Sequence, residues 1–363
     1  MAIFGQMADP RRTNKGNLRH PLCDILFLMV SAAICGMDNW QAVVLFGQHR
    51  LDWLRRFFPY RYGIPSPDTL ERFFGALEPA VFSRFFMEWA SGCFKPLEGE
   101  VVSIDGKRIR GSGGKNGQED AIHMVSAFAT ANRLSLGQLD VFDKSNEITA
   151  IPVLLELINT KGCMVSIDAM GCQRDIAAKI RSKKSDYLLA VKDNQGELLE
   201  QVEKMFSIRT PCGRDRSVDG GHGRVETREC DVIGELGFLD LDEPWPDLKT
   251  IVRIRSQRYF KKTGETQHQT RYYISSAAHS AETFNAQIRS HWGIENNLHW
   301  ELDVNFGEDA AKRKNRNAVR NFNAILKICL RMVERHSEKL SKKGKMISAS
   351  LNDTFREQIL GYF

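Results

Sequence analysis

Two aspartates that end matching short segments are the residues of this chain best suited to do chemistry. The sequence Val-Ser-Ile-Asp occurs twice, at Val102–Asp105 and at Val165–Asp168. Each copy is an apolar run that closes with a carboxylate, a pattern typical of a buried strand with an acid at its tip. If the two strands lie side by side in one sheet, their carboxylates repel each other, and a divalent cation between them relieves that repulsion. The pair therefore predicts a metal site.

The segment Arg289–Trp300 holds the densest group of reactive side chains and contains the candidate third acid, Glu295. On a regular helix Glu295 lies in an apolar stripe and shares its face with His291 and His299. A carboxylate in such a stripe is costly to bury without a partner, and either a metal or a salt bridge to Arg289 or a lysine can offset the cost. We expect the metal, because two aspartates already provide the rest of a site.

Other residues of this segment are weaker candidates. Glu301 projects to the opposite side of the helix and is expected to be solvated, whereas Asp303 lies on the flank and is an alternative to Glu295. His291 and His299 bracket Glu295 at four-residue intervals, but the His-Glu-x-x-His pattern of a zinc protease is absent. We therefore expect the two histidines to hydrogen-bond carboxylates or to contact phosphate, and zinc is disfavoured.

The positive charge of the chain is unevenly distributed. The net charge of the 363 residues is +6. A chain of this length usually forms two or three domains, and its 42% hydrophobic content is enough for ordinary buried cores. Basic residues gather after the first aspartate, at Lys107, Arg108, Arg110 and Lys115, and again throughout residues 310–345. A basic cluster is usually only a solvated face, but one beside a metal site favours a polyanionic substrate.

Several classes of protein are disfavoured by what the sequence lacks. The eight cysteines contain no CxxC pair, which favours reduced thiols over a disulfide or zinc framework. The longest apolar stretch, residues 25–37, is too short to span a bilayer, and no export signal is evident at the N-terminus. A phosphate-binding loop and a Gly-x-Ser-x-Gly elbow are also absent. We expect a soluble cytoplasmic protein with no membrane partner.

Hydrophobic periodicity predicts an α/β protein in four parts. Residues 1–98 form a helical domain, in which Ile64–Leu70 opens a helix that either enters a DNA groove or serves as scaffold. Residues 99–206 predict three strands, a helix, a strand, a helix and a strand, at 101–105, 122–129, 134–142, 147–160, 163–168, 172–182 and 187–191. This is the order of a ribonuclease-H-like core, a mixed sheet with flanking helices that carries acids at the ends of its first and fourth strands.

The remaining residues interrupt and then complete this core. Residues 207–278 predict a β-rich insertion, with strands at 225–233, 250–259 and 269–275. Residues 279–363 are expected to supply the Glu-bearing helix, at about 281–303, and basic C-terminal helices, beginning with one at 316–340.

These residues resemble the H-repeat-associated proteins and their relatives, the insertion-sequence transposases of the DDE class. The resemblance covers nearly the whole chain in order. It rests on Asp9–Arg11 with His20–Leu22, Ser103–Lys107, Ser166–Ala169, Val191–Gln195, Gly221–Glu226, Tyr273–Ser276, His291–Asn296 and Leu302–Val304.

The resemblance implies a DNA transposase whose β insertion precedes the Glu-bearing helix. Asp105, Asp168 and Glu295 would hold two Mg²⁺ ions, with Mn²⁺ as a substitute, for in-line phosphoryl transfer at the terminal inverted repeats of an insertion sequence. Arg289 matches a position where related transposases hold an arginine, whereas their later lysine has no counterpart because Leu302 takes its place. Contacts to DNA phosphates would come from Lys107, Arg108, Arg110, His222, Arg224 and Arg289.

The implied partners are double-stranded DNA, both terminal repeats and target, and a second copy of the chain in a synaptic homodimer. Sequence recognition would fall to residues 1–98, and the protein would associate with the bacterial nucleoid when bound to DNA. Two alternatives remain: a metal-dependent nuclease on the same core, which cuts DNA without joining it, and a non-catalytic DNA-binding remnant of a transposase.

Overall fold

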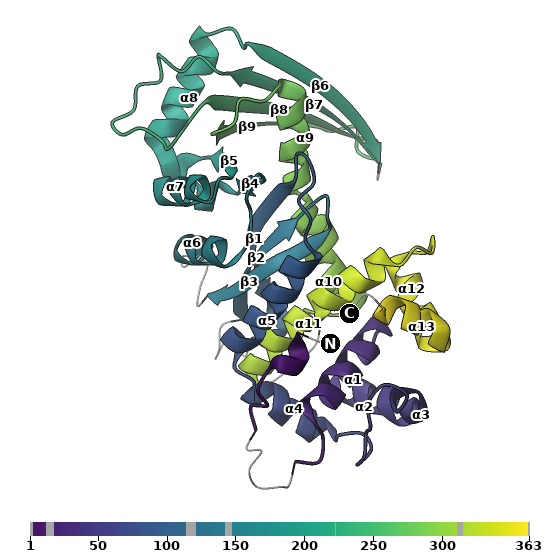
Figure 1. The fold of residues 1–363 in the computed structure, drawn as a ribbon. Helices are drawn as coiled ribbons and strands as arrows, with labels where there is room; N and C mark the ends of the chain where they lie inside the picture. Colours follow the sequence, from purple (N-terminus) through teal and green to yellow (C-terminus); the bar gives the residue numbers. More distant parts are fainter. Residues whose placement is uncertain are drawn as a thin grey trace.

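One mixed sheet of nine strands forms the backbone of the molecule (Figure 1). The computed structural model describes residues 3–11, 18–113, 121–141, 147–221, 223–310 and 315–361. The strand order across the sheet is β3-β2-β1-β4-β5-β9-β8-β7-β6. Helices cover both faces of the sheet, and a larger group of helices lies below it in Figure 1. Within the described residues no helix is long and apolar enough to cross a membrane.

The first five strands match the predicted order. They are β1 (Val101–Ile109), β2 (Ile122–Ala129), β3 (Leu134–Val141), β4 (Met164–Ile167) and β5 (Asp186–Val191). β1 pairs antiparallel with β2 and parallel with β4, and β4 pairs parallel with β5. One boundary prediction is wrong: β1 does not end at Asp105, because its ladder with β2 continues to Ile109. Asp168 does follow the last residue of its strand.

Helices on opposite faces of these strands bury alternate side chains. α9 (Ala281–His291) packs Phe284 and Ile288 in one cluster with Val101 of β1 and Met164 of β4. α6 (Glu147–Leu157) and α7 (Arg174–Ser182) lie on the other side of these strands (Figure 1). Val165 of β4 belongs to the same apolar cluster as Ile151 of α6 and Ile176 of α7. The parallel part of the sheet, β1, β4 and β5, is therefore largely buried on both faces, as parallel strands require.

The β-rich segment extends the core sheet. It contains β6 (Gly213–Gly221), β7 (Arg224–Ile233), β8 (Thr250–Phe260) and β9 (Thr266–Ser275), and it is preceded by α8 (Gly196–Ile208). The three strands predicted in this segment are present. β6, whose Gly- and Arg-rich sequence has little β character, was not predicted. β9 pairs antiparallel with β5, so the segment continues one ladder and is not a separate layer.

The two ends of the chain share a helical body. α1 (Leu22–Ile34), α2 (Trp40–His49), α3 (Leu51–Leu54), α4 (Pro67–Ala76) and α5 (Pro79–Cys93) pack with α11 (Arg316–Arg335), α12 (Lys342–Leu351) and α13 (Asp353–Leu360). The side chain of Asn321 on α11 donates to the carbonyls of Phe74 and Leu77, at 3.0 and 2.8 Å. Trp53 donates to Glu357 at 2.8 Å. One continuous apolar cluster joins both ends of the chain.

This shared core predicts that residues 1–98 will not fold when expressed alone. Such a fragment exposes the faces of α1 and α4 that pack on α11, and it loses apolar burial worth about 25 cal/mol per Å². We expect its circular dichroism to show no cooperative thermal unfolding, whereas the full chain unfolds cooperatively. A fragment with a sharp transition would contradict the shared core.

Candidate active site

The parallel pairing of β1 with β4 places the two aspartates side by side, as predicted. Ile104 is paired with Ile167, so Asp105 and Asp168 are the next residues on adjacent strands. Asp168 caps a short 3₁₀ turn, and its carboxylate accepts a hydrogen bond from the Met170 N–H at 3.1 Å. Because both strands belong to one sheet, the backbones of the two aspartates are held next to each other before any ligand binds.

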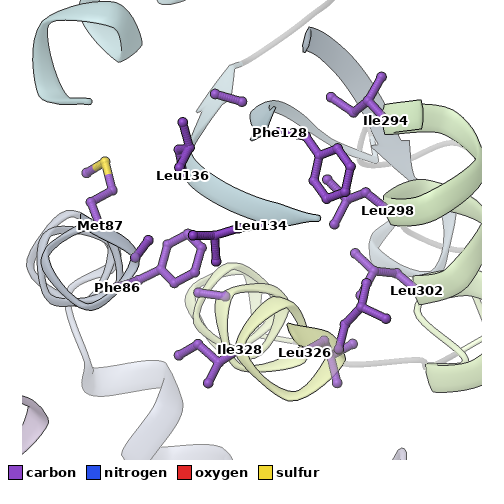
Figure 2. Close-up of a cluster of buried hydrophobic side chains, with 14 of the residues drawn as sticks. Phe86, Met87, Phe128, Leu134, Leu136, Ile294, Leu298, Leu302, Leu326 and Ile328 are labelled. Atoms are coloured by element: carbon purple, nitrogen blue, oxygen red, sulfur yellow. The ribbon is translucent and has the colours of Figure 1, made fainter. Parts of the chain in front are cut away.

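Glu295 is brought to this edge of the sheet by an irregular helix. After α9 ends at His291, the chain forms a π-helical turn at Glu295–His299 and continues as α10 (Trp300–Phe306). π-helical turns within helices are frequent at functional sites. The apolar side of this segment, formed by Ile294, Leu298 and Leu302, faces Phe128 of β2, with Leu326 of α11 near Leu302 (Figure 2). The packing holds the adjacent polar side, which carries His299 and Asp303, beside β1.

Asp105, Glu295 and His299 converge in the structure. Each offers a ligand atom within 4.8 Å of the other two. Nδ1 of His299 lies 3.3 Å from Oε2 of Glu295 and 3.6 Å from Oδ2 of Asp105. The imidazole therefore stands between two carboxylates. Asp168, although on the adjacent strand, is not part of this group of three.

The electrostatics of the site favour a bound cation. Burial raises the pKa of Asp105 to about 6, the imidazole of His299 opposes that shift, and the charges of Asp168 and Glu147 add to it. The hydrogen bond from His299 lowers the pKa of Glu295. Ionised Asp105 is thus disfavoured among neighbouring carboxylates, and a divalent cation would remove the penalty. Oxygen-rich donors of this kind suit Mg²⁺ or Mn²⁺.

His291 lies apart from this group. It is half-buried, and desolvation lowers its pKa, although the nearby charge of Asp168 and a hydrogen bond to the Ser166 carbonyl act in the opposite direction. His291, at the end of α9, thus lies near Asp168, whereas His299 lies near Asp105.

Two expectations about this helix are wrong. The side chain of Glu295 is 59% exposed, so it is not a carboxylate buried in an apolar stripe. The break after α9 and the π turn rotate it to the open edge. Glu301, expected to be solvated, is only 10% exposed and pairs with Lys342 at 2.7 Å. Lys342 belongs to α12, one of the C-terminal helices, for which the sequence analysis gave no bounds.

Lys107 holds the Glu-bearing helix against β1. Its ammonium contacts the carboxylates of Asp303 and Glu308, the latter at 2.5 Å, and lies 3.4 Å from the His299 carbonyl. Burial alone would lower the pKa of Lys107, but Glu308 and Asp303 outweigh that effect and raise it. Because two carboxylates already compensate its charge, we interpret Lys107 as a residue that positions this helix. The phosphate contact expected of it from the sequence stays a prediction. Asp303 is likewise engaged here and not with Asp105.

A helix end and two residues of α11 complete this ion-pair network. Gly307, with φ +63°, ends α10 in the left-handed region, and the Glu308 N–H returns to the Leu302 carbonyl at 3.1 Å. This turn aims Glu308 at Lys107, and Asn323 of α11 also donates to Glu308. One turn later the buried ammonium of Lys327, whose pKa burial lowers to about 7, donates to the Ser126 hydroxyl at 2.7 Å.

Replacing Lys107 with Met should destabilise the protein by about 3–5 kcal/mol, because it leaves the buried Glu308 carboxylate without its main counter-ion. Arg110→Met is the matched control, since Arg110 pairs with the neighbouring Asp309 but is 86% exposed. That surface pair should be worth about 0–1 kcal/mol. Urea unfolding of both variants measures the difference, and equal losses would show that Lys107 is no more than a surface ion pair.

The remaining basic candidates occupy two places. Arg108 and Arg110 are exposed at the end of β1, where the Arg110 N–H donates to Asp309 at 2.9 Å. Arg224 at the start of β7 and Arg289 on α9 line one cavity of about 750 Å³. Arg289 also pairs with Asp219 of β6. His222 and Lys115 lie outside the described residues.

The sequence analysis missed four arginines of this cavity and Glu147, an acid whose charge acts on Asp105. The arginines are Arg133, Arg228, Arg258 and Arg271. Strand alternation could have placed Arg224 and Arg228 on one face of β7, but the neighbouring strands had first to be paired. Glu147 opens α6, and its carboxylate is buried in contact with the ring of His123. An acid in a helical first turn looks like ordinary N-terminal capping, so the sequence carries little signal for it.

Comparison with known proteins identifies the family. A model of the transposase DDE domain matches residues 96–332, and a model of the DDE-transposase-associated region matches residues 1–90. The chain belongs to the DDE transposase family. It is 40% identical to "Putative transposase YncI" of Escherichia coli O157:H7, over 97% of this chain and 92% of that one. It is 38% identical to "H repeat-associated putative transposase YhhI" of Escherichia coli K12, over 97% of this chain and 95% of that one.

Membership of the DDE family bears out the resemblance drawn from the sequence motifs. Among solved structures, a piggyBac transposase in a synaptic complex with hairpin DNA aligns with a TM-score of 0.45 and 11% identity, over 96% of this chain and 83% of that one. As a DDE transposase the chain is a mobile-element protein, and its acidic cluster of Asp105, Glu295 and His299 is able to hold a metal ion.

Proposed function

We propose that this DDE transposase cleaves DNA at the terminal inverted repeats of its element and joins the ends to target DNA in a divalent-metal-dependent reaction. The observation that carries the proposal is the convergence of Asp105 and Glu295 within 4.8 Å, from elements 190 residues apart, with Asp168 on the strand next to Asp105. Carboxylates held together at such a cost in repulsion are typical of a metal site.

The fold supports this assignment. In the strand order β3-β2-β1-β4-β5, an antiparallel meander is followed by two parallel strands, the arrangement expected of a ribonuclease-H-like core. Asp105 lies on its first strand, and Asp168 directly follows its fourth. β6 to β9 stand between that core and the Glu-bearing helix in the chain, where the β insertion was predicted.

In the proposed reaction, Asp105, Asp168 and Glu295 hold Mg²⁺, for which Mn²⁺ can substitute. When bound, two such ions activate the attacking hydroxyl and stabilise the leaving oxygen of an in-line phosphoryl displacement. The chain itself contributes fixed carboxylates on a rigid sheet. His299 orients Glu295 through the contact at 3.3 Å, and Lys107 holds the segment that carries both.

DNA would reach the site across basic surfaces on both sides of it. Arg108 and Arg110 extend from the end of β1, and Arg224 and Arg289 line the neighbouring cavity. Phosphate contacts from these side chains predict steep salt dependence. We further propose that the N-terminal helices recognise the terminal repeats and that two copies of the chain act together on paired ends.

Incubating the full-length protein with duplexes that carry the element's terminal repeats tests the proposal. We expect nicking at the repeat ends with Mg²⁺ or Mn²⁺ and none with EDTA, followed by joined products when target DNA is added. Cleavage without joined products would support the nuclease alternative. Specific binding to repeats without metal-dependent cleavage would support the non-catalytic remnant.

A further inference from the structure

An arginine-rich cavity adjoins the acidic cluster. Its volume is about 750 Å³, and its wall is formed by β7, β8 and β9, by the turn after β2 and by the end of α9. Six arginines line it, against a single acid, Glu226. The arginines are Arg133, Arg224, Arg228, Arg258, Arg271 and Arg289.

Most of these arginines contact another protein group. The most buried one, Arg228, lacks a full set of hydrogen-bond acceptors. Arg258 lies 3.3 Å from Glu226, Arg289 pairs with Asp219, and the Arg271 guanidinium lies 4.9 Å from the centre of the Trp292 ring. Arg228 is 7% exposed, and within the described residues its Nε finds no hydrogen-bond partner. Burying a guanidinium group without a full set of acceptors is costly, and an anion is the ligand that would remove the cost.

The position of the cavity indicates which anion this is. Asn296 and Asn297, the two residues that follow Glu295, line the cavity. A ligand seated there therefore contacts the same helical segment that carries Glu295. Arginine presents planar donors that match phosphate oxygens, and several arginines in one cavity match more than one phosphate of a polymer.

We propose that this cavity binds consecutive phosphodiesters of the DNA strand that enters the site, with Arg228 and Arg271 as its central contacts. The inference rests on the proposed function, since it takes DNA as the substrate. It adds four arginines to the DNA interface expected from the sequence and assigns the β6–β9 half of the sheet a direct part in holding the substrate.

The test is DNA binding by the full-length chain in EDTA, so that cleavage plays no part. Arg271→Ala and Arg228→Met are compared with Arg255→Ala, which removes the same charge from the opposite face of β8 and is 42% exposed. For each phosphate that a variant no longer neutralises, the slope of log affinity against log salt should become shallower by about 0.9 on duplex DNA or about 0.7 on single-stranded DNA. Arg255→Ala should leave the slope unchanged.

Two DNA substrates distinguish whether the bound phosphates belong to a duplex or to a single strand. One is a blunt duplex that ends in a terminal repeat, and the other is the same duplex with a single-stranded overhang. A larger effect of the variants on the overhang substrate assigns the cavity to an unpaired strand, and equal effects assign it to duplex backbone; both support the proposal.

Arg271→Ala guards against misfolding of the more buried Arg228 variant. Thermal unfolding identifies the folded variants, and if Arg228→Met fails to fold, Arg271→Ala decides alone. Folded variants with wild-type affinity and slope on both substrates would overturn the proposal. This outcome is distinct from failure of the proposed function, in which wild-type protein binds DNA but does not cleave it with Mg²⁺.

Discussion

Replacing Asp105 with Asn is expected to abolish DNA cleavage while leaving the fold and DNA binding intact. The substitution preserves the shape of a side chain beside Asp168 but removes a charge that the metal requires. Losing several kcal/mol of charge stabilisation in the transition state corresponds to a cleavage rate about 10³-fold lower or more. Single-turnover cleavage of a repeat-end duplex measures the loss, and gel-shift affinity of the same variant is the control.

The same variant should be more stable than the wild type at neutral pH in the absence of metal. Burial raises the pKa of folded Asp105 to about 6, above the ordinary value of 3.8, so folding favours its protonated form. The stability contributed by this group is complete below about pH 4 and is lost as the pH rises through about 6. At pH 7 the ionised carboxylate costs about 2–3 kcal/mol, and Asp105→Asn should recover part of that.

Thermal melts from pH 4 to pH 8 in EDTA check this prediction. The wild-type melting temperature should decline more steeply over that range than that of Asp105→Asn, and added Mn²⁺ should raise only the wild-type value. If the variant melts at a lower temperature than the wild type at pH 7 and still cleaves DNA, Asp105 is not a metal ligand.

Glu295→Gln should also reduce cleavage by orders of magnitude, because Glu295 is the helix acid that meets Asp105 and His299. Glu301→Gln is the internal comparison. Glu301 lies six residues away and pairs with Lys342, so its loss should lower stability without changing metal affinity or cleavage by folded protein. Asp303→Asn should weaken the contact with Lys107 and leave the number of bound metal ions unchanged.

Calorimetric titration with Mn²⁺, together with cleavage rates, distinguishes these acids. Weaker Mn²⁺ binding and loss of cleavage are expected for Glu295→Gln alone. A fully active Glu295→Gln protein beside an inactive, well-folded Asp303→Asn protein would transfer the role to Asp303.

The sequence predicted the strands of the core because their pattern is local. Asp168 follows a run of four buried residues, and its strand could be recognised from those residues alone. The extension of β1 past Asp105 was missed, since Gly106 and Lys107 look like a turn and only the ladder with β2 keeps them extended. The presence of each core strand was thus predictable, whereas the residues at which a strand ends depended on pairing with strands far away in the sequence.

For Glu295 and Glu301, too, the local spacing was predictable from the sequence and the burial was not. Helical spacing correctly placed His299 beside Glu295, because residues four apart are neighbours on a helix. Burial was not predictable from spacing: Glu301 is covered by α12, and Glu295 is turned to the open edge by the break after α9. The role of Lys107 depended on Glu308, 201 residues later, which no local pattern connects to it.

The most direct test of the central claim is the location of Mn²⁺ by anomalous diffraction from crystals of the full-length protein grown with the metal. We expect an anomalous peak bounded by the carboxylates of Asp105 and Glu295, and its disappearance in Asp105→Asn crystals. The contrary result is a peak only at the second group of acids, Asp303, Glu308 and Asp309, which the structure fills with the Lys107 ammonium. Such a peak, in protein that still cleaves DNA, would contradict the assignment of Asp105, Asp168 and Glu295 as the metal site.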